Sequence, residues 1–443
     1  MAEVSARELA YASLAAFRKE GAWSDVYLRK TAPRAELSPR DLALAAQLSY
    51  GVLQNRLLLD FWISHFSSVS LKKLEPQVLD ILRLGFFQLA MLDRVPQSAA
   101  VNESVKLARR HSNPRAAGLV NAVLRAAAGR KDALPLPPRE PRETYLSVLY
   151  SHPLWYIREM LPVLGPEETE ALLGADNAPA PLWIQVNSLK ASPEEVAARL
   201  EGEGVSAEPH PWLPGCMKLS GAGGLERLSA WREGLFQIQD PASRLAVLAA
   251  APEPGFRVID GCAAPGGKSF AAAMEMKNRG SILSCDIYPA KLEAIREGAG
   301  RLGISVLETA LLDASKPEPS LVGSADLVLS DVPCSGMGVI RKKPDIRYKD
   351  PDSLKTLPSL QLAILRNLSA YVKPGSVLLY STCTLRREEN EAVVRAFLDE
   401  APGFAPESFR LPGLGEVPGG MLTLWPHRHG TDGFFICRMR KNI

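Results

Sequence analysis

Apolar residues recur at helical spacing through the first 130 residues of the chain. One face of the stretch 75–92, for example, carries the apolar residues Val78, Leu82, Phe86 and Leu89. Apolar and polar residues do not alternate in this region with the period of two that a half-buried strand requires. The pattern therefore predicts an all-helical bundle over residues 1–130.

A proline-rich stretch follows this helical region. Residues 131–142 read K-D-A-L-P-L-P-P-R-E-P-R, and four prolines in so short a segment indicate a stiff linker. Helical spacing then returns up to about residue 176. We therefore expect residues 131–180 to form a linker with connecting helices.

Strand and helix patterns are mixed over residues 181–235. Strand patterns at 183–189 and 212–219 flank an amphipathic helical pattern at 193–202. This stretch is predicted to be a small α+β segment that leads into the rest of the chain.

From residue 236 to the end, short apolar runs alternate with helical patterns. The helical patterns include 289–302, 354–372 and 388–400. Strands are predicted at 256–260, 281–286, 305–310, 325–330, 376–381 and 434–439. Near-continuous apolar strands separated by helices are typical of a mainly parallel, doubly wound sheet, which binds ligands at the carboxyl ends of its strands.

Composition places the chain among ordinary globular proteins. Its 443 residues are 46% hydrophobic and 23% charged, and this length favours two or three domains. No apolar run is long enough for a membrane span, and residues 1–20 contain charges where a signal peptide has an apolar core. Six cysteines lack the spacing of a zinc site or a disulfide framework. We expect a cytoplasmic protein with reduced thiols, no metal and no membrane partner.

Charge is distributed unevenly along the chain. The net charge is +3, but residues 1–130 hold 18 Lys and Arg against 11 Asp and Glu, a local charge of +7. Such a basic helical region suggests an anionic partner such as RNA. A solvated charged surface explains the charge alone about equally well.

The stretch 258–270, V-I-D-G-C-A-A-P-G-G-K-S-F, reads as a buried strand, a tight glycine loop and the start of a helix. A Rossmann dinucleotide loop requires G-x-G-x-x-G, which is missing here. A phosphate-binding P-loop would end in Gly267, Lys268 and Ser269, but its first glycine would fall on Cys262. A loop for S-adenosylmethionine (AdoMet) is the third interpretation.

Acidic residues end or closely follow four successive predicted strands: Asp260, Asp286, Asp313 and Asp331. Asp286 lies 19 residues after Gly267, the spacing at which an acid meets a ribose hydroxyl. A P-loop enzyme requires one acid for magnesium, and this set of four favours AdoMet.

Two cysteines also follow predicted strands, Cys334 in S-D-V-P-C-S-G-M-G and Cys383 in Y-S-T-C-T. In a parallel sheet both would open onto the same crevice. A thiolate that adds to C6 of cytosine makes C5 nucleophilic enough to attack a sulfonium methyl group. Asp331 is placed to stabilise charge at N3 of the ring. Spacing alone does not decide which cysteine attacks.

Several motifs together resemble the NOL1/NOP2/Sun family of RNA cytosine-C5 methyltransferases, and within it the bacterial Sun/Fmu type that acts on 16S (small-subunit) rRNA. They are D-G-C-A-A-P-G-G-K (260–268), D-V-P-C-S-G-M-G-V-I-R-K-K-P-D (331–345), S-T-C-T (381–384), E-E-N (388–390) and D-G-F-F (432–435). The basic helical region is similar to the NusB-like RNA-binding domain, in V-N-E-S-V-K-L-A (101–108) and V-N-A-V-L-R (120–125).

This resemblance implies a multidomain protein. Its parts would be an all-α NusB-like N-terminal bundle, a small α+β segment and, at 236–443, an α/β Rossmann-like class I AdoMet methyltransferase domain. The activity it implies is AdoMet-dependent methylation of C5 of a cytosine in 16S rRNA through a covalent cysteine–C6 adduct.

The resemblance also implies roles for individual residues. Cys383 would be the nucleophile, Cys334 would assist product release, and Asp331 would serve both the cofactor and the base. Asp286 would contact the ribose of AdoMet and Asp313 its adenine. Lys268 would belong to the catalytic set and, with the rest of the loop, to the cofactor contacts, namely Cys262, Ala263, Ala264, Pro265, Gly266, Gly267 and Lys268.

The basic residues that follow Cys334 are expected near the RNA backbone. They are Arg341, Lys342, Lys343 and Arg347. An unpaired cytosine is the expected target, because a paired base would have to be flipped out. We expect a monomer. The alternatives are methylation of tRNA or large-subunit rRNA, a non-catalytic RNA-binding assembly factor, and a P-loop NTPase.

Overall fold

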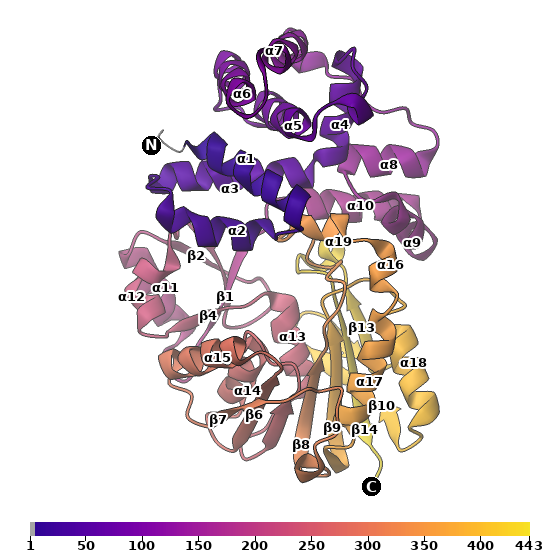
Figure 1. Ribbon diagram of the computed structural model, residues 1–443. Coiled ribbons are helices and arrows are strands. Elements are labelled where there is room, and N and C mark those ends of the chain that lie inside the picture. Colours follow the sequence, from indigo (N-terminus) through magenta and orange to yellow (C-terminus); the bar gives the residue numbers. More distant parts are fainter. Residues whose placement is uncertain (1–4) are drawn as a thin grey trace. The chain divides into compact units, whose positions relative to one another are not determined.

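The computed structural model describes residues 5–443 (Figure 1). Residues 1–4 of the predicted helical region lie outside this range. The chain divides into two compact units. The helical unit comprises the chain up to Ala178 together with Lys342–Lys349, and the catalytic unit comprises Pro179–Arg341 with Asp350–Ile443. The predicted boundaries did not assign residues 342–349 to the helical unit.

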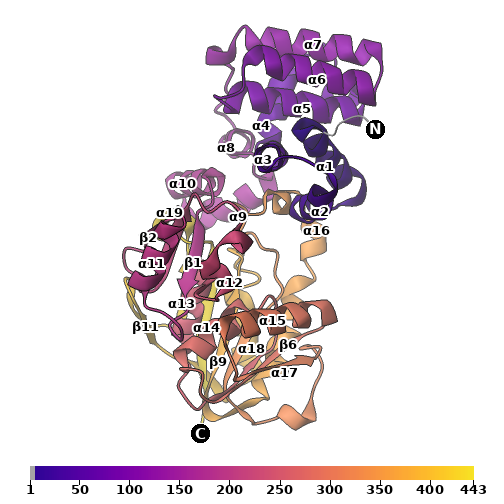
Figure 2. The same cartoon turned by 90° about the vertical axis from the view of Figure 1, so that its left-hand side faces the viewer.

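The helical unit contains no strand among its described residues, as its apolar periodicity predicts. The predicted stripe on residues 75–92 is buried in the core of this unit, and Figure 2 shows α5, α6 and α7 side by side. Its helices are α1 (Ala6–Glu20), α2 (Ser24–Thr31), α3 (Pro39–Gln54), α4 (Arg56–Phe66), α5 (Pro76–Met91), α6 (Gln97–His111), α7 (Pro114–Ala128), α8 (Arg142–Tyr150), α9 (Leu154–Leu164) and α10 (Pro166–Asn177).

Arg347 ties three helix ends of this unit together. It lies in the 3₁₀ turn η6 (Pro344–Tyr348) and is 1% exposed. Its Nη1 donates to the carbonyl oxygens of Gln54 at 2.9 Å and Tyr150 at 3.0 Å, the last residues of α3 and α8. Its Nη2 donates to Oδ1 of Asn177, the last residue of α10, at 2.6 Å. A cation at the negative ends of three helix dipoles is electrostatically favourable.

The expectation that Arg347 contacts RNA is therefore wrong. Burial lowers the pKa of its guanidinium to about 10, so it stays charged at neutral pH, but it is enclosed by the protein and its Nη donors are occupied by backbone carbonyls and the Asn177 side chain. The chain pattern alone placed it in a basic surface loop. Only tertiary contacts between residues 342–349 and distant helices show that it is structural.

The catalytic unit begins with a small four-stranded sheet. Its order is β2-β3-β1-β4, with antiparallel pairs throughout. The predicted strand and helix patterns correspond to β1, α11 and β3, whereas β2 and β4 are too short to show in the sequence. The elements are β1 (Leu182–Val186), α11 (Pro193–Gly202), β2 (Ser206–Pro209), β3 (Cys216–Ser220), α12 (Ser229–Arg232) and β4 (Phe236–Ile238).

The large sheet has the order β10-β14-β9-β8-β5-β6-β7, with β13 paired to β14. Its five strands β5–β9 are parallel, and β14 runs antiparallel to β9. The predicted fold class is confirmed. The strands are β5 (Arg257–Asp260), β6 (Ser281–Asp286), β7 (Leu307–Leu311), β8 (Ala325–Asp331), β9 (Val372–Thr382), β10 (Phe404–Pro406), β13 (Met421–Leu424) and β14 (Phe434–Lys441), and a separate pair is formed by β11 (Phe409–Leu411) and β12 (Gly415–Val417).

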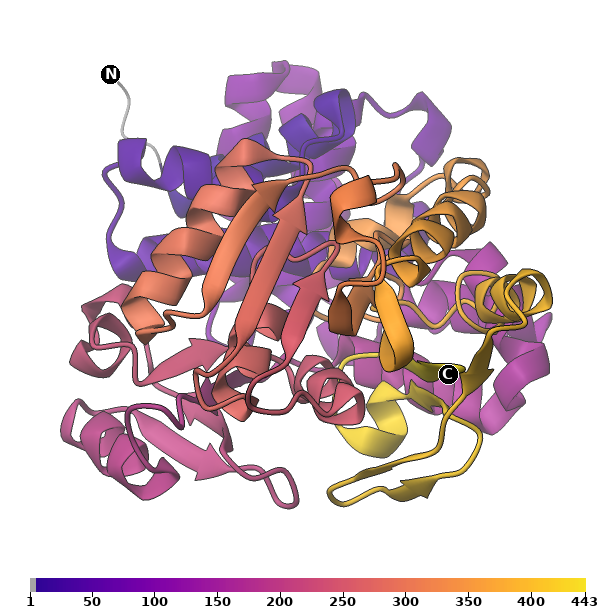
Figure 3. The same ribbon diagram turned by 90° about the horizontal axis from the view of Figure 1, so that it is seen from below.

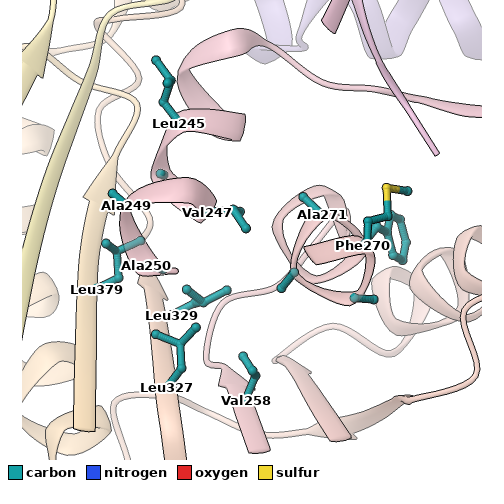
Figure 4. Close-up of a cluster of buried hydrophobic side chains, with 14 of the residues drawn as sticks. Leu245, Val247, Ala249, Ala250, Val258, Phe270, Ala271, Leu327, Leu329 and Leu379 are labelled. Atoms are coloured by element: carbon teal, nitrogen blue, oxygen red, sulfur yellow. The ribbon is translucent and has the colours of Figure 1, made fainter. Parts of the chain in front are cut away.

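Both faces of this sheet are covered by helices (Figure 3). Neighbouring strand residues point to opposite faces. On one face, Val258, Leu327 and Leu379 pack against α13 and α14, as Figure 4 shows. Ile259 and Val328 pack on the other face with α17 and α18. The helices are α13 (Pro241–Ala250), α14 (Gly267–Glu275), α15 (Pro289–Leu302), α16 (Pro351–Leu354), α17 (Leu357–Ser369), α18 (Glu391–Glu400) and α19 (Pro426–His429).

The order of the strands also locates the crevice. The chain proceeds from β5 outward to β6 and β7, then crosses back to β8 on the other side of β5. Ligands of such sheets bind where the order reverses, outside the carboxyl ends of the strands. Asp260 and Asp331, which end β5 and β8, mark that position. Within residues 5–443, no helix is both long enough and apolar enough to cross a membrane.

Replacing Arg347 with alanine is expected to lower the free energy of unfolding of the helical unit by about 3 kcal/mol or more, because several buried carbonyl groups lose their donor. Chemical denaturation followed by circular dichroism measures the change. The matched control is Lys343→Ala, whose exposed side chain lies four residues away. Equal stability of the two variants would contradict this role.

Candidate active site

At one position of the glycine loop between β5 and α14, the backbone adopts a conformation that only glycine accommodates. Gly266 has φ +103°, and a Cβ built there would lie 2.5 Å from the ring of Phe270. The loop therefore turns sharply into the N-terminus of α14, which begins at Gly267. This turn brings backbone atoms to the edge of the crevice.

A cavity of about 170 Å³ opens beside this loop. Of the predicted cofactor residues, Gly266, Asp286 and Asp313 do not line it. The residues that line it are Ile238, Gln239, Asp240, Ser243, Asp260, Cys262, Ala263, Ala264, Pro265, Gly267, Lys268 and Asp331.

Asp260 is the buried acid at the base of this cavity, only 1% exposed. Burial raises the pKa of its carboxyl to about 6 although Ser269 donates to its Oδ2 at 2.7 Å. Ser284 in turn donates to Ser269 at 2.8 Å, which fixes both hydroxyls. The chain of hydrogen bonds holds α14 against the ends of β5 and β6.

Two further strand-end acids, Asp286 and Asp313, lie at the ends of the next two strands. Asp286 ends β6, is 8% exposed, and accepts the backbone N–H of Tyr288 at 3.0 Å. Asp313 follows β7, and Ser315 donates its hydroxyl to it at 2.6 Å. This hydrogen bond lowers the pKa of Asp313.

Lys268 and Asp331 form an ion pair at the cavity. The Lys268 Nζ lies 2.7 Å from Oδ2 of Asp331 and 5.0 Å from the centre of the Phe434 ring. Ser381 donates to Oδ1 of Asp331, also at 2.7 Å. Each carboxylate oxygen thus has one fixed donor, which orients the Asp331 side chain.

Cys334 and Cys383, which are 49 residues apart in the sequence, lie side by side in the structure. Their Sγ atoms are 3.2 Å apart, within sulfur hydrogen-bonding distance. The hydrogen bond from Cys334 and the charge of Lys268 lower the pKa of the Cys383 thiol, although burial and Asp331 oppose this. The same hydrogen bond, together with burial, raises the pKa of Cys334 well above its ordinary value. The Lys268 charge thus favours the ionised form of Cys383, whereas the charges of Glu389 and Asp331 disfavour that of Cys334.

A buried carboxylate joins the loops that carry these thiols, the P-C loop (residues 332–341) and the T-C loop (residues 382–390). Glu389 is fully buried, and its Oε2 accepts the backbone N–H of Ser335 at 2.8 Å and the amide of Gln361 at 2.9 Å. The Ser335 hydroxyl also lies 2.8 Å from that of Thr384. Both loops are therefore fixed to one another beside the thiol pair.

The D-G-F-F segment closes this arrangement. Gly338 of the P-C loop donates to the carbonyl of Cys383 at 2.9 Å and accepts from the N–H of Gly433 at 2.8 Å. A Cβ at Gly338 would lie 1.9 Å from the carbonyl oxygen of Gly433. The glycines of both motifs allow three segments to approach at backbone distance.

Sequence reasoning assigned no role to several of these residues. Glu389 stands in the quoted E-E-N motif, but nothing in the chain shows that it points inward while Glu388 points outward. Gln239, Asp240 and Ser243 line the cavity from the N-terminus of α13. The string Q-D-P at residues 239–241, an N-cap residue before a proline, could have located that helix start.

Two of the expected RNA-binding residues keep exposed side chains. These are Lys342 and Lys343. The guanidinium of Arg341 lies 3.6 Å from the carboxylate of Asp432, with 9% of its side chain exposed. Among the described residues, no group of three His, Cys, Asp or Glu side chains could hold a metal ion.

Comparison with known families covers most of the chain. Residues 247–440 match the model of the 16S rRNA methyltransferase RsmB/F family, residues 4–129 match the NusB family, and residues 152–226 match the ferredoxin-like domain of RsmF/B-like methyltransferases. The Bacillus subtilis protein named probable ribosomal RNA small subunit methyltransferase B is 36% identical over 100% of both chains. The chain belongs to the RsmB/F family of 16S rRNA methyltransferases.

Two further comparisons support this assignment. The ribosomal RNA small subunit methyltransferase B of Vibrio cholerae is 32% identical over 93% of this chain and 92% of its own. The solved structure of PH0851 superimposes with a TM-score of 0.79 at 28% identity, covering 98% of this chain and 97% of that one. The resemblance predicted from the motifs is confirmed.

As an RsmB/F methyltransferase the protein uses AdoMet as its methyl donor, as predicted. The cavity suits the sulfonium part of that molecule. Two carboxylates, Asp260 and Asp331, face a space that a cationic sulfonium would enter. Their charge favours a cation over the triphosphate of a P-loop enzyme.

Replacing Glu389 with glutamine is expected to slow methyl transfer about 10²-fold, because the loops that carry Cys334 and Cys383 lose the carboxylate that fixes them to one another. Initial rates with excess AdoMet and small-subunit rRNA measure the effect. AdoMet affinity should stay within about twofold, since Glu389 does not line the cavity. Glu388→Gln, one residue away with an exposed side chain, is the matched control. A wild-type rate for Glu389→Gln would refute a positioning role.

Proposed function

We propose that the protein methylates C5 of a cytosine in 16S rRNA through a covalent bond between Cys383 and C6 of the base. The observation that carries the proposal is the thiol pair, 3.2 Å apart and next to the Lys268–Asp331 ion pair. A methyltransferase that modifies an oxygen or an exocyclic nitrogen requires no such thiol. An aromatic carbon such as C5 does require activation by a nucleophile.

In the proposed reaction the Cys383 thiolate adds to C6, and the electron pair displaced from the C5–C6 double bond makes C5 nucleophilic. AdoMet, when bound, supplies the electrophilic methyl group. Loss of the C5 proton to a base then restores the double bond as the bond between sulfur and C6 breaks. Cytosine leaves methylated and Cys383 returns to the thiolate.

Cys383 is the better nucleophile of the pair for a physical reason. The S–H of Cys334 stabilises the Cys383 thiolate as a hydrogen-bond donor, and the Lys268 ammonium adds a favourable charge interaction. Cys334 carries the proton and is positioned to assist release of the product. These unequal environments give two identical side chains different roles.

Asp331 is proposed to contact the base at N3 and to face the cofactor. Lys268 and Ser381 each donate to one of its oxygens at 2.7 Å, so the carboxylate approaches the ring in a fixed orientation. A group held in this way stabilises charge that develops on the ring without reorganising during the reaction. Lys268 thereby acts on both Asp331 and the Cys383 thiolate.

The AdoMet contacts are proposed to follow the strand ends. The loop from Cys262 to Lys268 would hold the methionine part, and Asp286 and Asp313 would hold the ribose and the adenine. Asp286 ends the strand next to β5, and Asp313 follows the strand after that. A ligand that spans these strand ends extends beyond the cavity beside the loop.

For the RNA, we propose an unpaired cytosine in 16S rRNA as the target. Both thiols are partly buried in the protein, and a base within a duplex could not present C6 to them without flipping. Lys342 and Lys343 follow the P-C loop with exposed side chains, which suits contact with phosphates near the target.

Replacing each thiol separately should distinguish the two roles. Cys383→Ala should reduce methylation to the background of the assay and form no protein–RNA adduct. Cys334→Ala should accumulate the adduct, because release is impaired. Labelled 16S rRNA, AdoMet and denaturing gel electrophoresis measure both outcomes.

The control for this experiment is Cys216→Ala, which removes a buried cysteine of the core and should leave both readouts unchanged. If Cys334→Ala loses the adduct while Cys383→Ala retains it, the two roles are reversed. Absence of any adduct together with normal methylation would rule out the covalent route.

The hydrogen bond between the thiols also predicts a pH dependence. Because its pKa is lowered, the Cys383 thiol ionises at a lower pH than an ordinary cysteine, whose pKa is about 8.5. In Cys334→Ala the donor is lost, so the pH at which Cys383 is half-alkylated at a fixed time should rise. Iodoacetamide labelling followed by peptide mass spectrometry measures this pH. A curve that is unchanged or moves to lower pH would contradict the assigned hydrogen bond.

A further inference from the structure

A second cavity, of about 390 Å³, lies within the helical unit. This volume is in the range of sites that hold small ligands. It is lined from four parts of the chain: α1 and the loop after it, the junction of α3 and α4, α5, and residues 345–349. Its lining residues are Leu14, Phe17, Arg18, Gly21, Trp23, Val52, Leu53, Arg56, Asp80, Arg83, Asp345, Tyr348 and Lys349.

The carboxylates of this cavity already have partners. The carboxylate of Asp80 forms ion pairs with Arg18, at 2.8 Å, and with Arg83, at 3.1 Å. Arg83 also donates two hydrogen bonds to Asp60, at 2.7 and 2.8 Å. Asp345 accepts the hydroxyl and the backbone N–H of Ser24. No acid is left to attract a cationic ligand.

Arg56 is different, because none of the described residues supplies a carboxylate within ion-pairing distance of it. Its guanidinium instead lies over the ring of Tyr348, 4.9 Å from the ring centre. Burial and the neighbouring Arg83 lower the pKa of Arg56, although Asp60 and Asp80, both engaged by Arg83, act on it from beyond ion-pairing distance in the opposite direction. A guanidinium held by an aromatic face in this way retains its donors for a planar or tetrahedral anion.

An aromatic surface lies beside this cation. Trp23 is 37% exposed although it is a large apolar side chain, and Lys349 lies 5.4 Å from the centre of its ring. Phe17 packs edge-on against Tyr348, with ring centres 5.8 Å apart. A partly exposed indole near an arginine without an ion-pair partner combines the two features that hold one nucleotide, a stacking surface and an anion contact.

We propose that this cavity binds one unstacked nucleotide of the rRNA substrate, with its phosphate at Arg56 and its base against Trp23. The proposal rests on the RNA substrate proposed above and adds a recognition site in the helical unit. The phosphate supplies the direct ion-pair partner that Arg56 does not have among the described residues. Aromatic stacking requires no particular base, so this contact adds affinity without selecting a sequence.

The experiment measures binding of fluorescein-labelled single-stranded fragments of 16S rRNA to the full-length protein over a range of salt concentrations. Arg56→Ala should weaken binding about fivefold or more. It should also reduce the slope of log K against log salt by about 0.7, the value for one phosphate contact to a single strand. Trp23→Ala should weaken binding about fivefold or more with the slope unchanged, because it removes stacking and no charge.

Conservative variants and a charge control accompany these two. Arg56→Lys should restore the salt slope and Trp23→Phe should restore most of the affinity, which a general loss of folding would not allow. Arg139→Ala removes an exposed arginine of the same unit outside the cavity and should leave affinity within about twofold. AdoMet affinity should be unchanged in every variant.

Two results would overturn the assignment. If Arg56→Ala and Trp23→Ala bind RNA as Arg139→Ala does, the cavity takes no nucleotide of the substrate. If free nucleoside monophosphates bind the wild type while the RNA affinity of Arg56→Ala is unchanged, the cavity serves a free nucleotide instead. Failure of the proposed function is distinguishable, because wild-type protein would then give neither a methylated cytosine nor an adduct while the binding comparison still stands.

Discussion

The parallel register of β8 and β9, which sets Asp331 opposite Ser381, determines where the proposed reacting groups lie. Cys334 comes three residues after the first of this pair and Cys383 two residues after the second. Because both strands end at the same edge of the sheet, their loops start side by side. A slip of one residue would turn Asp331 to the opposite face and separate it from Lys268. Glu389 then fixes the loops beyond the strands, where the sheet no longer constrains them.

Buried charge serves two different purposes in this molecule. At Glu389 and Arg347 the charged group is surrounded by donors or carbonyls of the protein, and its effect is to hold backbone segments in place. At Lys268 and Asp331 the charges border a cavity, and their field acts on the Cys383 thiol. The difference lies in what remains accessible: a fully surrounded charge is structural, and a charge beside open space is available for chemistry.

Much of the fold and of the site could be predicted because the signals are local. The strand-end acids and both cysteines could be recognised because each follows an apolar run that ends at a polar residue. The glycine loop could be recognised from its sequence motif. Arg347 and Glu389 could not be assigned in this way. Glu389 directly follows the exposed Glu388, and Arg347 lies four residues after the exposed Lys343. Only contacts with distant helices and loops distinguish the buried residues from the exposed ones. The family resemblance, not spacing, ranked Cys383 above Cys334.

Because residues 342–349 belong to the helical unit, they affect when this unit can finish folding during synthesis. Chain synthesis proceeds from the N-terminus, and domains generally fold as they emerge. The helical unit cannot complete itself in this way, because Arg347 reaches the ends of α3, α8 and α10 only after nearly 350 residues have been synthesised. Its last structural piece arrives after the glycine loop and the P-C loop. Completion of the N-terminal unit is thereby tied to synthesis of most of the catalytic one.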